Sequence, residues 1–182
     1  PKISSVKKIK WNDLDLVFLS LPNGEAQNII KKKFFHYKNL KFIDLSADFR
    51  IKDYKIFEKN YKIKHKAKDL IKHSLYSIPE INKDKINKFR IISNPGCYPT
   101  SIQLPLIPLI KNNLIQTKNI IIDSKSGYSG AGKGIEKKFT HKNLYHSTYA
   151  YGLNNHRHEC EIHQELKKYS KNIDFIFTPH LL

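Results

Sequence analysis

The chain of 182 residues is long enough for one large domain or two small ones, and its hydrophobic fraction of 40% suffices to form a core. The net charge of +17 comes from 33 basic residues, of which only three are arginines, whereas nucleic-acid sites favour arginine for bidentate and stacked contacts. We therefore expect no nucleic acid as a partner, and we expect the charge to attract a small anionic substrate instead. We also expect no membrane as a partner, because no apolar run reaches the length of a membrane span.

The two cysteines, Cys97 and Cys160, occur in a chain with no secretory signal in residues 1–10. We therefore expect a reducing, cytoplasmic location and no structural disulfide. The chain begins with Pro1, contains no methionine, and ends at Leu182 shortly after a strand-like apolar run. These features predict an internal fragment of a longer protein, cut at both ends.

Short apolar runs separated by helical segments organise the first half of the chain. Such alternation of strands and helices indicates an α/β architecture with a parallel sheet. Residues 50–75 are dense in lysine and tyrosine, and we expect an exposed excursion between strands there. The predicted strands are residues 15–20, 41–46 and 89–93, with a turn at 21–24 and a helix at 25–34.

The second half of the chain changes character after Cys97. Pro105 and Pro108 interrupt the helix that follows, so we expect this helix to be short or kinked. We place a domain boundary at this point, with residues 1–96 before it and residues 97–182 after it. The remaining predicted elements are strands at 119–123 and 173–177 and a helix at 159–169.

The segment 93–100, Ser-Asn-Pro-Gly-Cys-Tyr-Pro-Thr, places Cys97 on a tight turn between a strand end and a helix start. Backbone N–H groups and the positive end of a helix dipole stabilise a thiolate at such a position, and the same N–H groups can hold an oxyanion. The position therefore offers a nucleophile together with stabilisation of a transition state. A half-buried structural cysteine at a turn is the alternative interpretation.

Histidines and carboxylates gather in residues 156–163, which include His156, His158 and Glu161. A histidine near a cysteine can act as a general acid/base, and a carboxylate on the same helix can orient it. A polar, solvated helix start is the alternative interpretation. Zinc is a third reading of these residue types, but a second cluster at metal-ligand spacing is missing, so we predict no metal.

Two further segments are candidates for ligand contacts. The glycine-rich residues 126–134 allow a backbone to approach a phosphate, although a mobile surface loop has the same composition. Residues 44–50, Asp-Leu-Ser-Ala-Asp-Phe-Arg, begin at a predicted strand end, where ligands bind in open α/β sheets. Arg50 can pair there with a substrate carboxylate or phosphate, or with Asp44 or Asp48 in an ion pair that orders the loop.

Taken together, five segments in order along the chain resemble one family closely, the N-acetyl-gamma-glutamyl-phosphate reductases of arginine biosynthesis, in their longer-chain branch. The order of the segments over most of the chain carries the resemblance, since no single segment suffices. The segments are Asp15-Leu-Val-Phe-Leu-Ser-Leu-Pro-Asn-Gly24, Asp44-Leu-Ser-Ala-Asp-Phe-Arg50, Ser93-Asn-Pro-Gly-Cys-Tyr-Pro-Thr100, Ser126-Gly-Tyr-Ser-Gly-Ala-Gly132, and His156-Arg-His158 with Glu161-Ile162.

The resemblance implies a fold in two parts. Residues 1–96 would form a partial Rossmann-like NAD(P)-binding domain that lacks its N-terminal part. Residues 97–182 would form part of an α+β catalytic and substrate domain of the semialdehyde dehydrogenase dimerisation type. The implied reaction is the NADPH-dependent reduction of N-acetyl-L-glutamate 5-phosphate to the 5-semialdehyde through a cysteine thioester, with release of phosphate. A homo-oligomer is expected when the protein is full length.

The resemblance also implies roles for individual residues. Cys97 falls on the nucleophile and His156 on the acid/base, with His158 as the runner-up and Glu161 on the carboxylate of the motif. Contacts with the dinucleotide are expected from Pro22, Asn23, Gly24, Ser129, Gly130, Ala131 and Gly132, and contacts with the substrate from Arg50, Asn94 and Arg157.

The chain also departs from the pattern of the family. Cys160 stands where proline is usual, and the glycine-rich dinucleotide fingerprint expected before Pro1 is absent, so the fragment itself is expected to be inactive if it acts alone. Three alternatives stay open: a sister acyl-phosphate reductase of lysine biosynthesis that acts on an amino-adipyl phosphate, a cysteine hydrolase with a Cys97–His156 pair, and a basic nucleic-acid-binding module.

Overall fold

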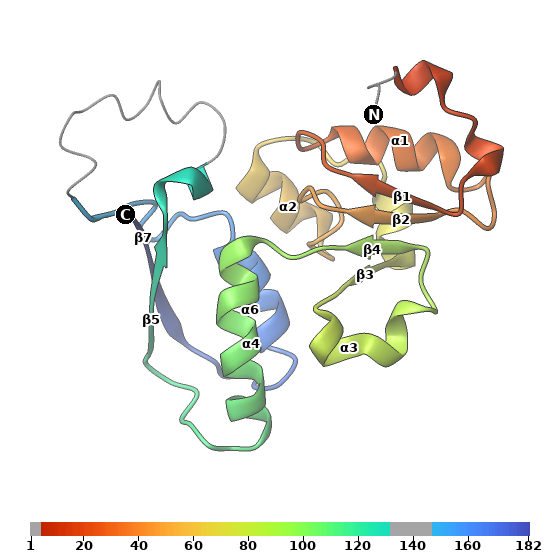
Figure 1. Ribbon diagram of the computed structural model, residues 1–182. Coiled ribbons are helices and arrows are strands. Elements are labelled where there is room, and N and C mark those ends of the chain that lie inside the picture. The colour runs from red at the N-terminus through yellow and green to blue at the C-terminus, as the bar shows by residue number, and fades with distance from the viewer. Residues whose placement is uncertain (1–4, 132–146) are drawn as a thin grey trace. The chain divides into compact units, whose positions relative to one another are not determined.

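The computed structural model describes residues 5–131 and 147–182, and the chain divides into two units, Pro1–Gly96 and Cys97–Leu182 (Figure 1). In the described residues, the first unit has a four-stranded sheet and the second has a three-stranded sheet. Helices accompany the strands in both units, which confirms the α/β architecture with a parallel sheet that the sequence predicts.

The sheet of the first unit is parallel throughout. Its register pairs Leu19 with Asp44, and it pairs both Asp44 and Tyr76 with Ser93. The carboxyl ends of the strands therefore lie along one edge, where ligands bind in open α/β sheets. The strands are β1 (Leu16–Leu19), β2 (Lys41–Asp44), β3 (Ser74–Tyr76) and β4 (Ile91–Ser93), and their order is β1-β2-β4-β3.

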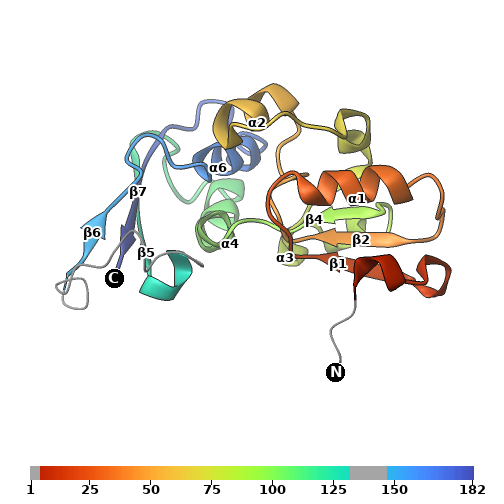
Figure 2. The ribbon, with the colours of Figure 1, turned by 90° about the horizontal axis from the view of Figure 1, so that it is seen from above.

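Helix α1 (Glu25–Lys33) covers one face of this sheet (Figures 1 and 2). It follows Gly24, whose φ of +92° is a conformation that favours glycine. Ala26 and Ile30 are fully buried, and three lysines stand in the last turn, at the negative end of the helix dipole. The helix predicted over 25–34 is thus confirmed. Its buried side chains share one core cluster with Leu19, Phe34, Leu40, Phe42 and Ile91.

The lysine-rich residues 50–75 are structured, so the prediction of an exposed excursion is wrong. Lys64 and Lys66 are exposed, whereas His65 and Ala67 beside them are buried. This alternation keeps lysines in solvent and apolar or hydrogen-bonded groups in the core, which composition alone does not reveal. The segment contains α2 (Tyr54–Tyr61), the 3-10 helix η3 (Lys68–His73) and the start of β3. The unit also contains η1 (Val6–Lys8), η2 (Trp11–Asp13) and α3 (Pro79–Ile86).

The second unit packs two helices against one face of a mixed sheet. Strand β5 runs parallel to β7, and the short β6 pairs with β7 antiparallel. Helices α4 and α6 lie side by side next to this sheet in both views (Figures 1 and 2). The elements are α4 (Cys97–Lys111), β5 (Ile120–Ser126), η4 (Tyr128–Ala131), β6 (Tyr149–Ala150), α6 (Glu159–Leu166) and β7 (Phe175–Leu181).

The sequence predicts that this helix is short or kinked, and helix α4 is not short, because it runs through both of its prolines. A proline removes the N–H that would bond the carbonyl four residues earlier, here the carbonyls of Ser101 and Leu104. Those two residues and both prolines are exposed, so water can satisfy the carbonyls, while the opposite face of the helix is buried. The buried residues of α4 are Tyr98, Pro99, Ile102, Gln103, Ile107 and Ile110.

The two faces of the β5–β7 pair differ in burial. Ile122, Phe175 and Phe177 are buried, whereas Ile121 and Ile176 are 78% and 61% exposed. Ile121 and Ile176 are direct partners in the strand register. The second unit therefore presents two neighbouring isoleucines on the face of the sheet that points away from its core.

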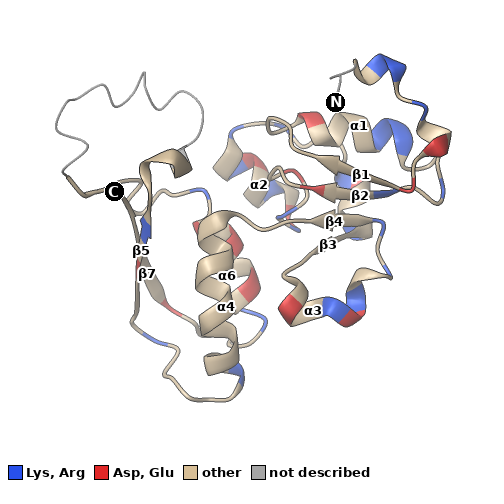
Figure 3. Ribbon diagram, in the orientation of Figure 1, with Lys and Arg blue, Asp and Glu red and all other residues tan. Residues whose placement is uncertain are grey.

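Lysine and arginine residues are spread along the helices and loops of both units (Figure 3). Two helices of the second unit differ, since α6 contains no lysine or arginine and Lys111 at the end of α4 is the one charged residue of that helix. Among the described residues, no helix combines the length and the hydropathy that a membrane crossing requires.

Candidate active site

Cys97 is the first residue of α4 and is exposed, and it follows β4 after only three residues. The first turn of a helix carries backbone N–H groups without helical partners, and these groups stabilise negative charge. Both cysteines are free thiols. Burial raises the pKa of the Cys160 thiol to about 12, and its Sγ donates to the carbonyl of Arg157 at 3.0 Å. Of the two thiols, Cys97 is thus the one placed for nucleophilic chemistry.

Two tyrosines form a hydrogen-bonded chain beside Cys97. The Tyr151 hydroxyl donates to the Tyr98 hydroxyl at 3.1 Å, and Tyr98 donates to the carbonyl of His180 at 3.0 Å. Burial, the hydrogen bond with Tyr98 and the charge of Cys97 raise the pKa of Tyr151, so the Tyr151 hydroxyl stays protonated. Because the charge of Cys97 acts on the Tyr151 hydroxyl, the thiol and this hydroxyl lie close to each other.

His156 is enclosed by rings from three parts of the second unit. Tyr98 from α4 and Tyr151 approach it edge-on with centroids at 5.4 Å and 5.6 Å, and Phe177 from β7 does so at 5.5 Å. Burial, together with the positive charge of Arg157, lowers the pKa of His156 to about 4. Since Tyr98 follows Cys97 directly and also contacts His156, the predicted nucleophile and the predicted imidazole belong to one cluster.

His158 and Glu161 form the second layer of this cluster. His158 Nε2 lies 4.0 Å from Glu161 Oε1, and both side chains are buried. The ring of His158 also approaches that of His156, with centroids 4.9 Å apart. His158 immediately precedes α6 and Glu161 lies in its first turn, so the spacing of three residues brings this imidazole and this carboxylate together.

Arg157 is exposed, and its charge acts on both His156 and Tyr151. An exposed guanidinium beside a nucleophile is suited to an anionic group of a substrate. Arg50 is different, since it is 7% exposed. Its Nε donates to the carbonyl of Asn94 at 2.7 Å and its Nη2 to the carbonyl of Leu45 at 3.1 Å, so it ties together the segments after β4 and β2.

The residues after β1, predicted to contact a dinucleotide, lie at the carboxyl edge of the sheet. Pro22 and Asn23 are exposed there, and Asn23 accepts a hydrogen bond from the backbone of Ala47. The first turn of α1 is already occupied, because the Asp48 carboxylate accepts from the N–H of Gly24 at 2.6 Å and from the N–H of Gln27 at 3.1 Å. The negative charge of Asp48 disfavours a phosphate at the start of α1. Pro22 and Asn23 therefore suit contact with an uncharged part of a nicotinamide dinucleotide.

The second predicted dinucleotide segment is described only in part. Ser129 and Gly130 are exposed within η4, which Ala131 ends, and Gly132 lies outside the described residues. A Cβ on Gly130 would come within 2.2 Å of Ser126 Oγ, so a larger residue there would have to displace this hydroxyl. Exposed backbone of this kind is compatible with close approach of a ligand.

Two family models match the chain. The model "Semialdehyde dehydrogenase, NAD binding domain" matches residues 2–89, and "Semialdehyde dehydrogenase, dimerisation domain" matches residues 97–182. Curated relatives from Arabidopsis thaliana and Clostridium novyi are each 44% identical over 100% and 96% of this chain, and one from Afipia carboxidovorans is 39% identical over 100%. All three are named N-acetyl-gamma-glutamyl-phosphate reductase, the Arabidopsis protein as probable and chloroplastic.

The chain belongs to the N-acetyl-gamma-glutamyl-phosphate reductase family. It spans about half the length of the curated relatives it matches, namely 45%, 50% and 52% of those three. Because these relatives include a chloroplastic protein and bacterial ones, the cytoplasmic location of this reductase-family chain stays a prediction.

A solved structure shares the fold of this reductase-family chain. The crystal structure of aspartate semialdehyde dehydrogenase II from Vibrio cholerae superposes with a TM-score of 0.64, covering 97% of this chain and 54% of that one. Its sequence is 15% identical, so the likeness concerns the fold alone.

Sequence reasoning missed two residues of the reductase-family cluster, Tyr98 and Tyr151, as participants. Tyr98 stands next to Cys97 in the motif, which is a usable signal. Tyr151 is 53 residues away from Tyr98 in the sequence, and no local pattern links it to the thiol. Asp48 was recognised as part of a motif, but its role as the cap of α1 depends on a contact between segments 24 residues apart.

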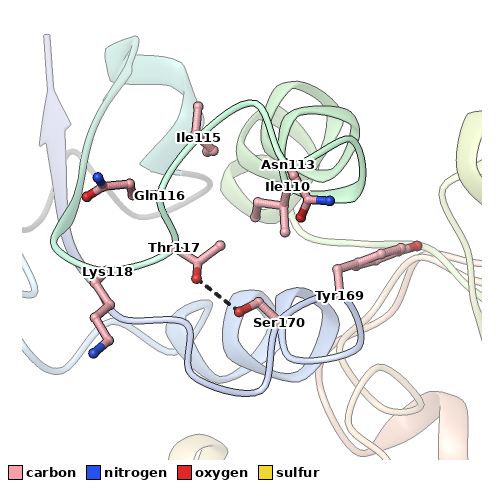
Figure 4. A pocket seen from close by; sticks show the side chains of 8 residues that line it. All are labelled: Ile110, Asn113, Ile115, Gln116, Thr117, Lys118, Tyr169 and Ser170. Carbon is pink, nitrogen blue, oxygen red and sulfur yellow. Dashed lines mark hydrogen bonds between the residues drawn. The ribbon is translucent and has the colours of Figure 1, made fainter.

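A pocket in the described part of the second unit lies away from the thiol. It has a volume of about 390 Å³ and lies at the far end of α4, where Thr117 and Ser170 share a hydrogen bond of 3.0 Å across it (Figure 4). Thirteen residues of helix, or about 20 Å at about 1.5 Å per residue, separate Cys97 from Ile110 in its wall. In residues 5–131 and 147–182, no group of three or more His, Cys, Asp or Glu is arranged to hold a metal ion.

Proposed function

We propose that this chain is part of an enzyme that reduces an acyl phosphate to an aldehyde through a thioester on Cys97. The observation that carries the proposal is the cluster in which an exposed Cys97 opens α4, next to Tyr98, Tyr151 and His156. Family membership supports the same reaction, since the matching relatives are named N-acetyl-gamma-glutamyl-phosphate reductase.

The first step follows from the position of the thiol. The Cys97 thiolate forms a bond from sulfur to the acyl carbon, and the bond from that carbon to the phosphate oxygen breaks. Phosphate leaves with the electron pair and takes up one proton. The first-turn N–H groups of α4 face the oxyanion that develops, and loss of one such donor typically costs about 10²–10³ in rate. The product of this step is a thioester on Cys97.

A nicotinamide dinucleotide, when bound, supplies the hydride that reduces the thioester, and we propose NADPH for this role. The residues of this chain that would contact it are Pro22 and Asn23, which are exposed after β1, and Ser129 and Gly130, which are exposed in η4. After reduction, the carbon–sulfur bond breaks, the aldehyde leaves, and Cys97 returns to the thiolate.

We further propose N-acetyl-L-glutamate 5-phosphate as the substrate, and hence arginine biosynthesis as the setting, on the strength of the relatives' names. Arg157 is suited to an anionic group of this substrate, because it is exposed and its charge reaches His156 and Tyr151. Asn94 is exposed at the end of β4, three residues before the thiol, and we keep it as a second contact. Arg50 is buried and donates to two backbone carbonyls, so the substrate contact predicted for it from the sequence stays a prediction.

Self-association belongs to the same proposal. The second unit matches a dimerisation domain, and its sheet exposes Ile121 and Ile176 as register partners. Adjacent exposed isoleucines on an open sheet face are typical of a surface that another protein covers. We propose that a second copy of the chain covers this face.

The test is turnover of a Cys97→Ser variant, made in a polypeptide of the family's full length that carries this sequence. NADPH oxidation should depend on the acyl phosphate and should fall below detection in the variant. Serine is a weaker nucleophile than cysteine, and the oxygen ester that it forms is harder to reduce than a thioester. Dinucleotide binding should persist. A Cys160→Ser variant is the matched control and should keep its rate. Turnover retained in Cys97→Ser would exclude the covalent mechanism, and a preference for amino-adipyl phosphate would reassign the substrate.

A further inference from the structure

The two ring nitrogens of His156 have different surroundings. Nδ1 accepts a hydrogen bond from the backbone N–H of His158 at 3.2 Å. A nitrogen that accepts from an N–H carries no proton itself, so the neutral ring has its proton on Nε2. Within the part of the chain that the structure describes, Nε2 has no hydrogen-bond partner, which leaves Nε2–H available as a donor.

The surroundings of His156 also disfavour a positive charge on the ring. The groups facing it are the phenols of Tyr98 and Tyr151, the apolar ring of Phe177 and the imidazole of His158. Burial lowers the pKa of the ring most, and the positive charge of Arg157 adds to this effect, so the pKa falls to about 4. The nearby buried carboxylate, Glu161, pairs with His158 instead.

The ring is also fixed in orientation. Aromatic edges approach it from α4, from the segment after β6 and from β7, and a Cβ on Gly152 would stand 3.3 Å from its Cδ2. Such close packing leaves little freedom to flip the ring and exchange the two nitrogens. The backbone bond at Nδ1 adds a second restraint, so tautomer and orientation are set together.

We propose that His156 serves the reaction as a neutral hydrogen-bond donor through Nε2–H, directed at the oxyanion on the acyl carbon, and that it transfers no proton. Tyr98 and Tyr151 are then positioning residues, which act through the ring of His156. This assignment rests on the proposed acyl-phosphate reduction. Solvent water, rather than His156, then supplies the proton that the leaving phosphate takes up.

A neutral imidazole is an effective hydrogen-bond donor where burial holds its pKa low. Its Nε2–H is already in place before the oxyanion forms, so no group of the site has to reorganise during the reaction. The assignment makes a clear distinction from acid/base catalysis. An acid/base histidine contributes an ionisation to the pH profile of kcat/KM, whereas a neutral donor contributes none near its ordinary pKa of about 6.5.

The first experiment is NMR of the histidine ring nitrogens in the 182-residue chain, with a His156→Gln variant to assign the signals. We expect the Nε2–H tautomer between about pH 5.5 and 8, with no titration in that range. The Nδ1–H tautomer, or a midpoint near the ordinary value of about 6.5, would overturn the proposal. This measurement needs neither substrate nor cofactor, so it stands even if the proposed reaction is wrong.

The second experiment compares His156→Gln with His156→Ala in a polypeptide of the family's full length. Glutamine keeps an N–H near the position of Nε2 but does not titrate. We expect the Gln variant to keep most of kcat, the Ala variant to lose about 10²–10³, and the pH profile of Gln to match that of the parent. Equal losses in both variants, or disappearance of an ionisation in Gln, would contradict the donor role. A failure of Cys97→Ser to abolish turnover would count against the reaction and leave the tautomer unaffected.

Discussion

Asp44 and Asp48 show how one motif supplies two different electrostatic roles. The Asp48 carboxylate caps the first turn of α1, which lies close in space but 24 residues away in sequence. The Asp44 carboxylate accepts from the backbone and the hydroxyl of Ser46 and from the N–H of Phe49, so it shapes the loop after β2. Arg50 donates to the backbone carbonyls of Asn94 and Leu45, and its charge also acts on the Asp44 carboxylate.

Asp44 should give the free energy of unfolding a distinct pH dependence. It is fully buried, and burial raises its pKa from 3.8 to about 6 against the opposing effect of its hydrogen bonds with Ser46. The folded state then binds more protons than the unfolded state between these values. Stability should therefore fall as pH rises from about 4 to about 6, by on the order of 2–3 kcal/mol, and then level off.

Urea unfolding across this pH range tests the expectation, with Asp44→Asn as the variant, in which the fall should disappear. Glu58→Gln is the control with the opposite sign. Hydrogen bonds from His65 and Lys68 lower the pKa of Glu58, so its contribution is present above its unfolded pKa and is lost as pH falls. A fall between pH 4 and 6 that survives in Asp44→Asn would contradict the assignment.

At the scale of elements, the sequence predicts what local periodicity controls. The apolar runs at 15–20 and 41–46 and the amphipathic segment at 25–34 appear as β1, β2 and α1. Strand β3 was missed, because three residues at the end of a lysine-rich segment give too little pattern. It exists because it pairs with β4 over its whole length, a contact that only the tertiary fold provides.

Helix α4 offers a prediction about its prolines. Pro108 lies on the exposed face, and Pro108→Ala would restore an N–H to the carbonyl of Leu104. Alanine is more favourable than proline inside a helix by about 3 kcal/mol. Loss of the proline also gives the unfolded chain more conformational freedom, which opposes this gain, so we expect the folded state to be stabilised by about 1–2 kcal/mol. Urea unfolding measures it. Ile107→Ala, one residue away on the buried face, should instead destabilise by about 2–4 kcal/mol. A loss of stability in Pro108→Ala would mean that the packing of α4 depends on proline.

The exposed face of the β5–β7 pair offers a second prediction at this scale. Replacing Ile121 and Ile176 with threonine keeps β-branching but removes apolar surface, so the fold should be retained and self-association weakened. Sedimentation velocity over a range of concentrations measures the change. Leu114→Thr is the control, since this side chain is 68% exposed and lies outside the sheet. Equal association in the double variant and the parent would place the interface elsewhere.

At the scale of the whole molecule, the candidate site shows where a sequence stops being informative. Cys97, His156, His158 and Glu161 carry their chemistry in their residue types, so spacing and composition single them out. The contacts of Tyr151, the tautomer of His156 and the capping role of Asp48 depend on segments that meet only after folding. Arg50 shows the opposite limit, because its residue type suggests an anion site while its burial and hydrogen bonds describe a structural tie.

The central claim is a covalent intermediate on Cys97, and mass spectrometry of the acylated chain tests it most directly. A polypeptide of the family's full length that carries this sequence is incubated with N-acetyl-L-glutamate 5-phosphate without any dinucleotide, so that a thioester cannot be reduced, and is then digested and mapped. The account predicts one acyl group on the peptide that contains Cys97, none on the peptide that contains Cys160, and no label in Cys97→Ser. Label on Cys160, or equal label in Cys97→Ser, would contradict it.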